Sequence, residues 1–132
     1  MSTLQVGTIK SANSAAPVIQ NSSGTEKGQF AKAWCHVTVS GGTPSFDDSF
    51  NFSSITDVTA GFFKFNFTNA MSNNDYSAVS TSEVGSSNIT VAVTTAPTTS
   101  EVPFVYYRIT NFIGGGVAVD PPALAVVVFG DN

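Results

Sequence analysis

The sequence predicts an all-β fold, an antiparallel β-sandwich of jelly-roll-like form with an extended N-terminal arm. Valine, phenylalanine and isoleucine supply most of the apolar residues, whereas leucine occurs only at Leu4 and Leu124. Such β-branched and aromatic side chains suit a pleated sheet. Short alternating stretches, separated by Gly, Pro, Ser and Asn, recur roughly every 8 to 12 residues, as in sandwiches and barrels. No helical stripe exceeds a turn or two.

The first 28 residues form the expected arm, which precedes a single body of residues 29–132. Within the arm, "LQVGTI" and "PVIQ" could each form a short strand, and the remaining residues are polar. The apolar groups are too few to offset an ordering cost of about 1 to 2 kcal/mol per residue. The arm should therefore order against the body, sister chains or a larger partner. Its candidates for attachment and trimerisation are Leu4, Val6, Ile9, Val18 and Ile19.

The body begins with a stretch of strand-like alternation, "FAKAWCHVTV". Successive strand residues point to opposite faces, so one face should carry Ala31, Ala33, Cys35, Val37 and Val39. The other face should carry Phe30, Lys32, Trp34, His36 and Thr38. The following "SGGTP" predicts a turn.

A phenylalanine-rich segment, Phe50 to Met71, holds six of the eleven phenylalanines. We expect Phe50 and Phe52 to share a face of one strand, with "TDVTAG" as the next turn. Three more rings, Phe63, Phe65 and Phe67, should share a face of the following strand. The repeated "FNF" predicts a hairpin with matched aromatic pairs, which would pack one sheet against another.

Later strands are predicted over residues 76–81, 88–94, 103–112 and 123–129. The last of these, in "PPALAVVVFG", is apolar on both faces, which suits a central strand or one buried by a neighbouring subunit. The preceding "GGGVAVDPP" predicts a loop that spans residues 114–122.

The composition argues against several classes of partner. A net charge of −4 with five basic residues leaves no basic patch, so nucleic acid is not an expected partner. No window is apolar over the roughly 18 residues that would span a membrane, and the N-terminus does not resemble a secretory signal. We therefore expect no membrane insertion, and synthesis in a cytoplasm. The lone Cys35 excludes a disulfide within the chain.

The ionisable residues do not form a recognisable catalytic or metal-binding pattern. Asp47 and Asp48 are expected in a solvated turn, with a cation site or acid/base catalysis as weaker alternatives. Cys35 and His36 should diverge in a strand, so they are not expected to form a nucleophilic pair. A ring of three His36 side chains around a trimer axis could bind a metal, although an exposed or interface histidine is favoured. We thus expect no enzyme activity, catalytic residue, metal or cofactor.

The larger polar rings have two open interpretations. Trp34, Tyr76, Tyr106 and Tyr107 suit core or subunit contacts, which we favour, or a carbohydrate-like receptor surface. The receptor-binding candidates cluster in one stretch of the sequence: Tyr106, Tyr107, Gly114, Gly115, Gly116 and Asp120.

Three segments carry a resemblance to a known family: "VIQNSSGTEKGQFAKAW" from Val18, "SFNFSSITD" from Ser49 and "FKFNFTNAMSNNDYSAV" from Phe63. Within residues 18–79, a span of about half of the chain, they resemble small virion proteins of tailed bacteriophages, especially phages of cyanobacteria and other aquatic bacteria. The opening "STLQVGTIKS" also resembles the attachment region of many such fibre proteins. Cys35 and His36 stand where the family often has Val-Asn, and the resemblance fades beyond Ser80.

The resemblance implies a virion structural protein of the tail-fibre or receptor-binding type, a homotrimer that mediates host attachment by multivalent adhesion. Its expected partners are copies of itself, other virion proteins of the tail or capsid, and a host surface glycan or protein. Its expected location is the virion, assembled in the host cytoplasm. The alternative is a capsid decoration (cement) protein that stabilises the phage head.

Overall fold

A computed structural model describes residues 5–10, 18–83, 89–93, 96–111 and 115–130. The described residues form eleven strands and no helix, and hence no helix long and apolar enough to cross a membrane. The strands are β1 (Val18–Gln20), β2 (Glu26–Gln29), β3 (Ala33–Ser40), β4 (Thr43–Phe50), β5 (Phe52–Thr59), β6 (Phe62–Phe67), β7 (Ser77–Ser82), β8 (Ile89–Val93), β9 (Glu101–Asn111), β10 (Gly115–Ala118) and β11 (Ala123–Phe129).

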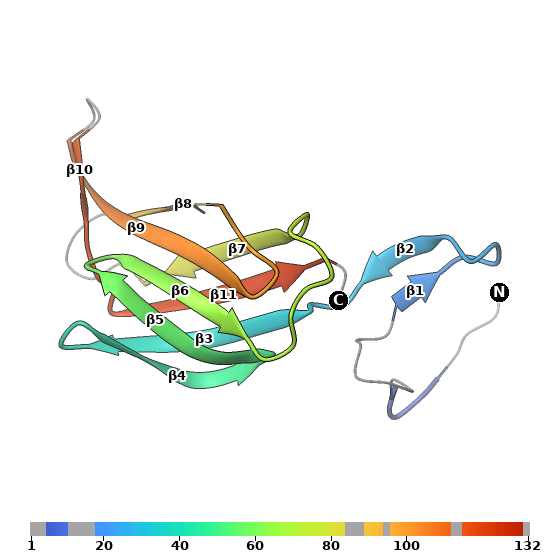
Figure 1. Ribbon diagram of the computed structural model, residues 1–132. Helices are drawn as coiled ribbons and strands as arrows, with labels where there is room; N and C mark the ends of the chain where they lie inside the picture. The colour runs from blue at the N-terminus through green and yellow to red at the C-terminus, as the bar shows by residue number, and fades with distance from the viewer. Residues whose placement is uncertain (1–4, 11–17, 84–88, 94–95, 112–114, 131–132) are drawn as a thin grey trace.

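Two antiparallel sheets pack face to face and confirm the predicted all-β sandwich (Figure 1). One sheet has the strand order β4-β3-β11-β7, and the other has β10-β9-β6-β5 with β8 also paired to β9. The four later strands lie within a residue or two of their expected bounds, and β11 matches them. The first and last strands of the body, β3 and β11, are neighbours, so β11 is a central strand, as its apolar sequence predicted.

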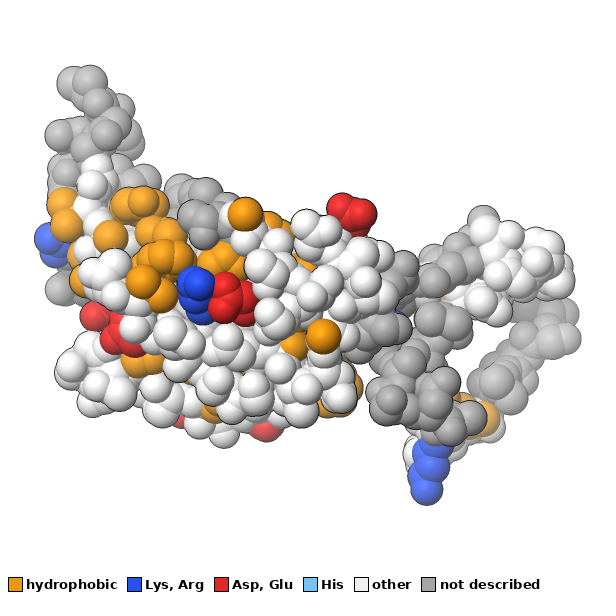
Figure 2. All heavy atoms as spheres, viewed as in Figure 1, with side chains coloured by type: hydrophobic (Ala, Val, Ile, Leu, Met, Phe, Trp, Pro, Cys, Tyr) orange, Lys and Arg blue, Asp and Glu red, His pale blue; other side chains and the backbone are white. Residues whose placement is uncertain are grey.

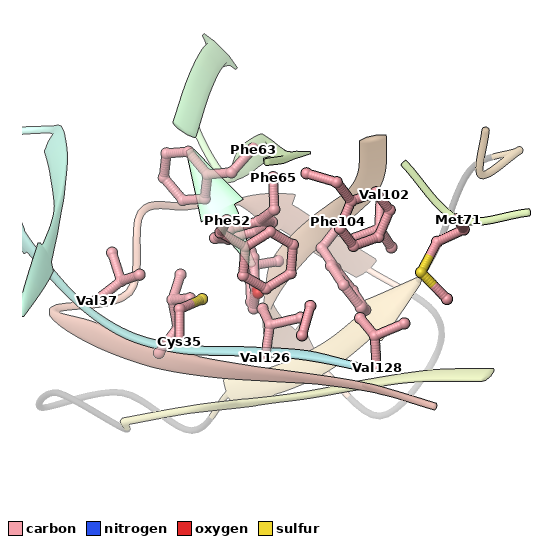
Figure 3. Close-up of a cluster of buried hydrophobic side chains, with 14 residues drawn as sticks. Cys35, Val37, Phe52, Phe63, Phe65, Met71, Val102, Phe104, Val126 and Val128 are labelled. Atoms are coloured by element: carbon pink, nitrogen blue, oxygen red, sulfur yellow. The ribbon is translucent and has the colours of Figure 1, made fainter. Parts of the chain in front are cut away.

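The core lies between the sheets and is rich in aromatic rings (Figure 3). Phe63, Phe65 and Phe67 of β6 point inward, as their spacing predicted. Phe67 stacks on Phe52 at a centroid distance of 5.2 Å, and Phe65 meets Phe104 edge-on at 6.1 Å. Each such pair contributes about 0.5 to 1.5 kcal/mol beyond its buried area. From the opposite sheet, β3 and β11 supply small and β-branched side chains, among them Val37 and Val126.

The prediction that Phe50 and Phe52 share a face is wrong. Asn51 lies between β4 and β5 with a φ of 58°, a left-handed conformation that asparagine tolerates better than most residues. The chain there passes from one sheet to the other, so Phe52 is buried while Phe50 is exposed. The aromatic pairing of the hairpin is therefore only half right, since Phe52 opposes Phe67 but Phe65 opposes Ile55.

The alternation in β3 is confirmed from Ala33 onward, with Cys35 and Val37 buried and Trp34 and His36 exposed. The outward placement of Lys32 is wrong, because the residue is only 4% exposed. The strand begins at Ala33, so its alternation does not extend back to Lys32. Instead, the Lys32 amide donates a hydrogen bond of 2.8 Å to the Val128 carbonyl.

The N-terminal segment, defined here as the described residues 5–10 and 18–30, lies beyond one end of the sandwich (Figure 1). The strand expected in "PVIQ" is confirmed as β1, which pairs with β2, a strand that was not predicted. Residues 5–9 of "LQVGTI" form no strand, so that prediction is wrong for its described part.

Candidate interaction surfaces

The outer face of the sheet β4-β3-β11-β7 carries a continuous row of apolar side chains. Trp34 of β3 is paired with Phe50 on one side and with Val127 on the other, and Val127 is paired with Val79 of β7. Side chains directly opposite one another in adjacent strands lie on the same face and in contact range. Phe50, Trp34 and Val79 are 46%, 37% and 57% exposed. We call Phe50, Trp34, Val127 and Val79 the outer row.

Beside the outer row lies a second row, which pairs His36 with Asp48 and Ala125. A hollow of about 320 Å³ adjoins it, lined by His36, Thr81, Ser82, Glu83, Ala123, Leu124 and Ala125. Its lining combines apolar residues of β11 with polar side chains from β3, β7 and residue 83. The hollow is open, and Glu83 is exposed.

The acidic pair Asp47–Asp48 lies within β4, so its predicted placement in a turn is wrong. The register between β3 and β4 shifts between His36 and Val37, which leaves Asp47 as the extra residue of a β-bulge. A bulge interrupts the alternation of a strand, and both carboxylates are therefore exposed. The premise that neighbouring strand residues point to opposite faces fails at this position.

The bulge brings the Asp47 carboxylate to two side chains of β3. Asp47 Oδ2 accepts a hydrogen bond of 2.8 Å from the Thr38 hydroxyl and lies 2.7 Å from His36 Nδ1. Both hydrogen bonds lower the pKa of Asp47, and the bond from Thr38 has the larger effect. The contact with Asp47 orients the His36 imidazole. Nucleophilic catalysis would also require a nucleophile from a third residue. Among the described residues, no three His, Cys, Asp or Glu side chains are close enough to hold a metal ion.

Cys35 lies on the opposite side of β3 from His36, as the alternation predicted. Its thiol is buried, and burial raises its pKa to about 12. Only the thiolate is a good nucleophile or metal ligand, so this cysteine acts as a small apolar core residue at neutral pH.

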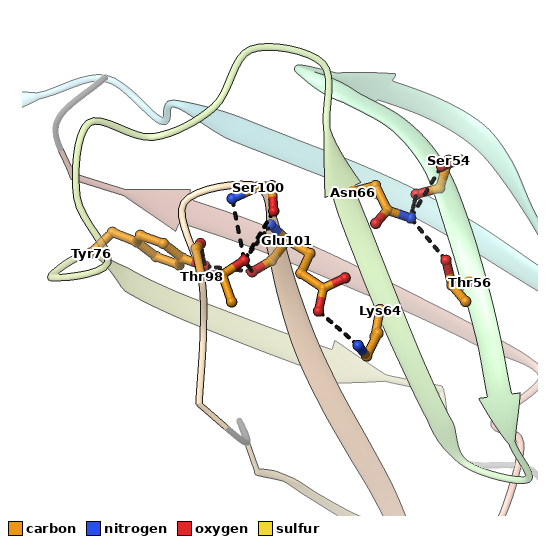
Figure 4. A network of polar contacts seen from close by, with 8 residues as sticks. All are labelled: Ser54, Thr56, Lys64, Asn66, Tyr76, Thr98, Ser100 and Glu101. Atoms are coloured by element: carbon orange, nitrogen blue, oxygen red, sulfur yellow. Dashed lines mark hydrogen bonds and ion pairs between the residues drawn. The ribbon is translucent and has the colours of Figure 1, made fainter.

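The outer face of the other sheet is polar at its centre. Lys64 Nζ forms an ion pair of 2.7 Å with Glu101 Oε1, and the Asn66 amide donates to the hydroxyls of Ser54 and Thr56 at 3.1 and 3.0 Å (Figure 4). We call these five residues the polar face. Figure 2 views this side of the molecule and shows apolar side chains gathered toward the end where β10 lies.

The receptor-binding candidates do not form one surface. Tyr106 has no exposed area, so its side chain belongs to the core, and its candidacy as a receptor contact is wrong. Its hydroxyl lies 2.5 Å from Ser80 Oγ. Ser80 in turn donates to the Ala125 carbonyl, which leaves Tyr106 as the donor in a bond that joins the two sheets. Burial raises the pKa of the Tyr106 hydroxyl.

The side chain of Asp120 also has a structural role. Its Oδ1 accepts a hydrogen bond of 2.6 Å from the Gly61 amide and fixes the β5–β6 turn. The expected loop over residues 114–122 is partly a strand, because β10 pairs with β9. Gly115 and Gly116 belong to β10, and Gly114 lies outside the described residues. Of the candidates, Tyr107 and Gly116 remain exposed beside each other, next to the exposed Val117.

The attachment candidates divide in a similar way. Val6 and Ile9 are exposed and line a hollow of about 360 Å³ together with Gly7, Thr8 and Phe30. Ile19 is exposed on β1, where the neighbouring Val18 pairs with Gln29. Leu4 lies outside the described residues. The contact of Phe30 with the hollow of Val6 and Ile9 was not predicted, because residues so far apart in the sequence give no signal of which side chains meet.

Comparison with known proteins adds no relative. No family model, no curated protein and no solved structure matches the chain.

Proposed function

We propose that the chain is a structural protein of a phage virion, of the tail-fibre or receptor-binding type, which acts as a homotrimer in host attachment. The observation that carries this proposal is the outer row, an exposed apolar surface that crosses all four strands of one sheet. Extended apolar surface on a soluble protein marks a contact site. The assignment to a phage virion rests on the family resemblance of the three sequence segments.

Adhesion would use the end of the molecule where β9 and β10 form a hairpin. Tyr107, Gly116 and Val117 are exposed there, and an amphipathic ring beside bare backbone suits a glycan or protein on the host surface. Three copies would present three weak sites, and their avidity would exceed the affinity of each one. No covalent chemistry is required.

The test is the number of copies in purified particles, measured against the major capsid protein by quantitative mass spectrometry. Low tens or fewer, divisible by three, would support a tail position, and hundreds would contradict it. The soluble protein in excess should also block adsorption of the phage to its host. The variant Tyr107→Ala should block it less well.

The second candidate is a capsid decoration protein. The N-terminal segment favours it, since this segment lies beyond the end of the sandwich (Figure 1) and its Val6, Ile9 and Ile19 are exposed, as a docking element for capsid subunits would be. Copies in the hundreds, with heads that burst on heating when the protein is missing, would establish this role in place of the first.

A further inference from the structure

We infer that the outer row of each copy is covered by the N-terminal segment of a second copy, in a head-to-tail contact that repeats around the assembly. The inference rests on the proposed function in one respect, that the protein works as a homo-oligomer. It goes further by naming the two surfaces that meet and by excluding a contact between two outer rows.

Charge is the first argument. The four strands of the outer row contain no lysine or arginine, and the exposed carboxylates of Asp47, Asp48 and Glu83 lie on the same sheet or at its edge. Two such faces placed together would bring like charges into contact, which is unfavourable. The N-terminal segment has a positive net charge, because its two lysines, Lys10 and Lys27, outnumber its single acid, Glu26.

Complementary apolar surface is the second argument. The hollow between Val6, Ile9 and Phe30 is open and mostly apolar, so it can accept an apolar side chain from another copy. A large ring on a neighbouring copy is a suitable occupant, and the outer row offers Trp34 and Phe50. Burial of a large ring in an apolar pocket is typical of the residues that dominate binding energy at interfaces.

The direction of the N-terminal segment is the third argument. It joins β3 through Lys32, whose amide is bonded to Val128 at the end of β11. The hairpin β1–β2 then lies beyond that end and covers neither sheet of its own copy (Figure 1). A segment that leaves its own sandwich and fits the face of another gives a heterologous contact, which closes into a ring when the rotation allows.

The test uses two single variants of the full chain. Trp34→Glu alters the outer row, and Ile9→Glu alters the N-terminal segment. Each should sediment as a monomer, because each lacks one half of every contact. An equimolar mixture should form a species of two chains, since the intact segment of the Trp34→Glu copy can dock on the intact row of the Ile9→Glu copy.

The matched control is Val58→Glu, which places the same charge at a residue of β5 that is 46% exposed on the other sheet. This variant should assemble as the wild type does. Circular dichroism checks that every variant is folded. If Trp34→Glu fails to fold, Val79→Glu changes the same row at a more exposed position.

Three results would overturn the inference. An Ile9→Glu protein that still assembles would mean that two outer rows, or other surfaces, meet directly. A wild-type chain that stays monomeric at high concentration would mean that no second copy covers the row. A mixture without the two-chain species would mean that the N-terminal segment of one copy does not dock on the outer row of another. Host adsorption is measured separately, so failure of the adhesion role leaves these sedimentation results unaffected.

Discussion

The two outer faces of the sandwich cover the same core, yet they differ in the side chains that they expose at their centres. On the polar face, Lys64 pairs with Glu101 and Asn66 bonds to two hydroxyls, so its groups are satisfied within the sheet or by water. On the other face, Trp34, Phe50 and Val79 expose apolar area that water does not stabilise. The centre of the first face is therefore suited to solvent, and the outer row on the second face is suited to a protein contact.

The largest effect should come from the core that both faces share. Phe65→Ala removes a fully buried ring that contacts Phe52 and Phe104, and we expect a loss of about 3 to 5 kcal/mol in the free energy of unfolding. The matched variant is Phe50→Ala, which removes the same ring from the exposed row and should cost about 0.5 kcal/mol or less in the isolated monomer. Urea unfolding measures both. Equal losses would mean that Phe50 is a core residue and would end the contrast between the faces.

A smaller loss should follow from a change in the turn that joins β5 to β6. Gly61 has a φ of 69°, and a β-carbon there would lie 2.5 Å from the Val119 amide nitrogen and 2.6 Å from the Tyr106 carbonyl oxygen. Gly61→Ala should therefore cost about 2 to 4 kcal/mol through strain and close contact. Gly41, which also has a positive φ but open space around it, is the control, and Gly41→Ala should cost less. A neutral Gly61→Ala, measured by thermal unfolding, would contradict this account of the turn.

The smallest effect concerns the acidic flank of the outer row. Because the pKa of Asp47 is lowered from 3.8 in the folded protein, its carboxylate stabilises the fold above that pH. This contribution is lost as the pH falls from about 3.8 through the lower folded value. Asp47→Asn should lower the urea midpoint slightly at neutral pH and less at pH values well below 3.8.

Asp48→Asn is the matched control for that variant, because it removes the same charge and leaves the contacts of Thr38 and His36 in place. An equal effect of the two variants at both pH values would show that general charge, and not these contacts, sets the pH dependence.

Much of the fold followed from the sequence because alternation directly reports which strand residues point inward. It worked for β3 and β6, where regular strands run without interruption. The central position of β11 was predicted differently, from a continuous run of residues that are apolar on both faces. Alternation failed at Asn51 and at Asp47, where a left-handed residue and a bulge change the phase of the pattern. Neither carries a strong local signal, since asparagine and aspartate are also common in ordinary turns.

The outer row could not be predicted, although Trp34 was correctly expected to point outward. Its surface depends on which strands become neighbours. Trp34 and Val127 come from near the two ends of the body and meet only because β3 pairs with β11. Register between strands distant in sequence is set by the packing of the whole sandwich and is not encoded in either strand alone. Tyr106 shows the same limit, since its burial depends on a partner in the opposite sheet.

The most direct test of the central claim uses Trp34, the single tryptophan of the chain, as a reporter within the outer row. Its fluorescence emission and its quenching by acrylamide would be followed over a wide range of protein concentration, beside sedimentation of the same samples. If the row is a contact surface, emission should lie at shorter wavelength and resist quenching in the assembled protein, then shift to longer wavelength and become quenchable on dilution. An accessible Trp34 at every concentration, in a protein that assembles, would contradict the claim.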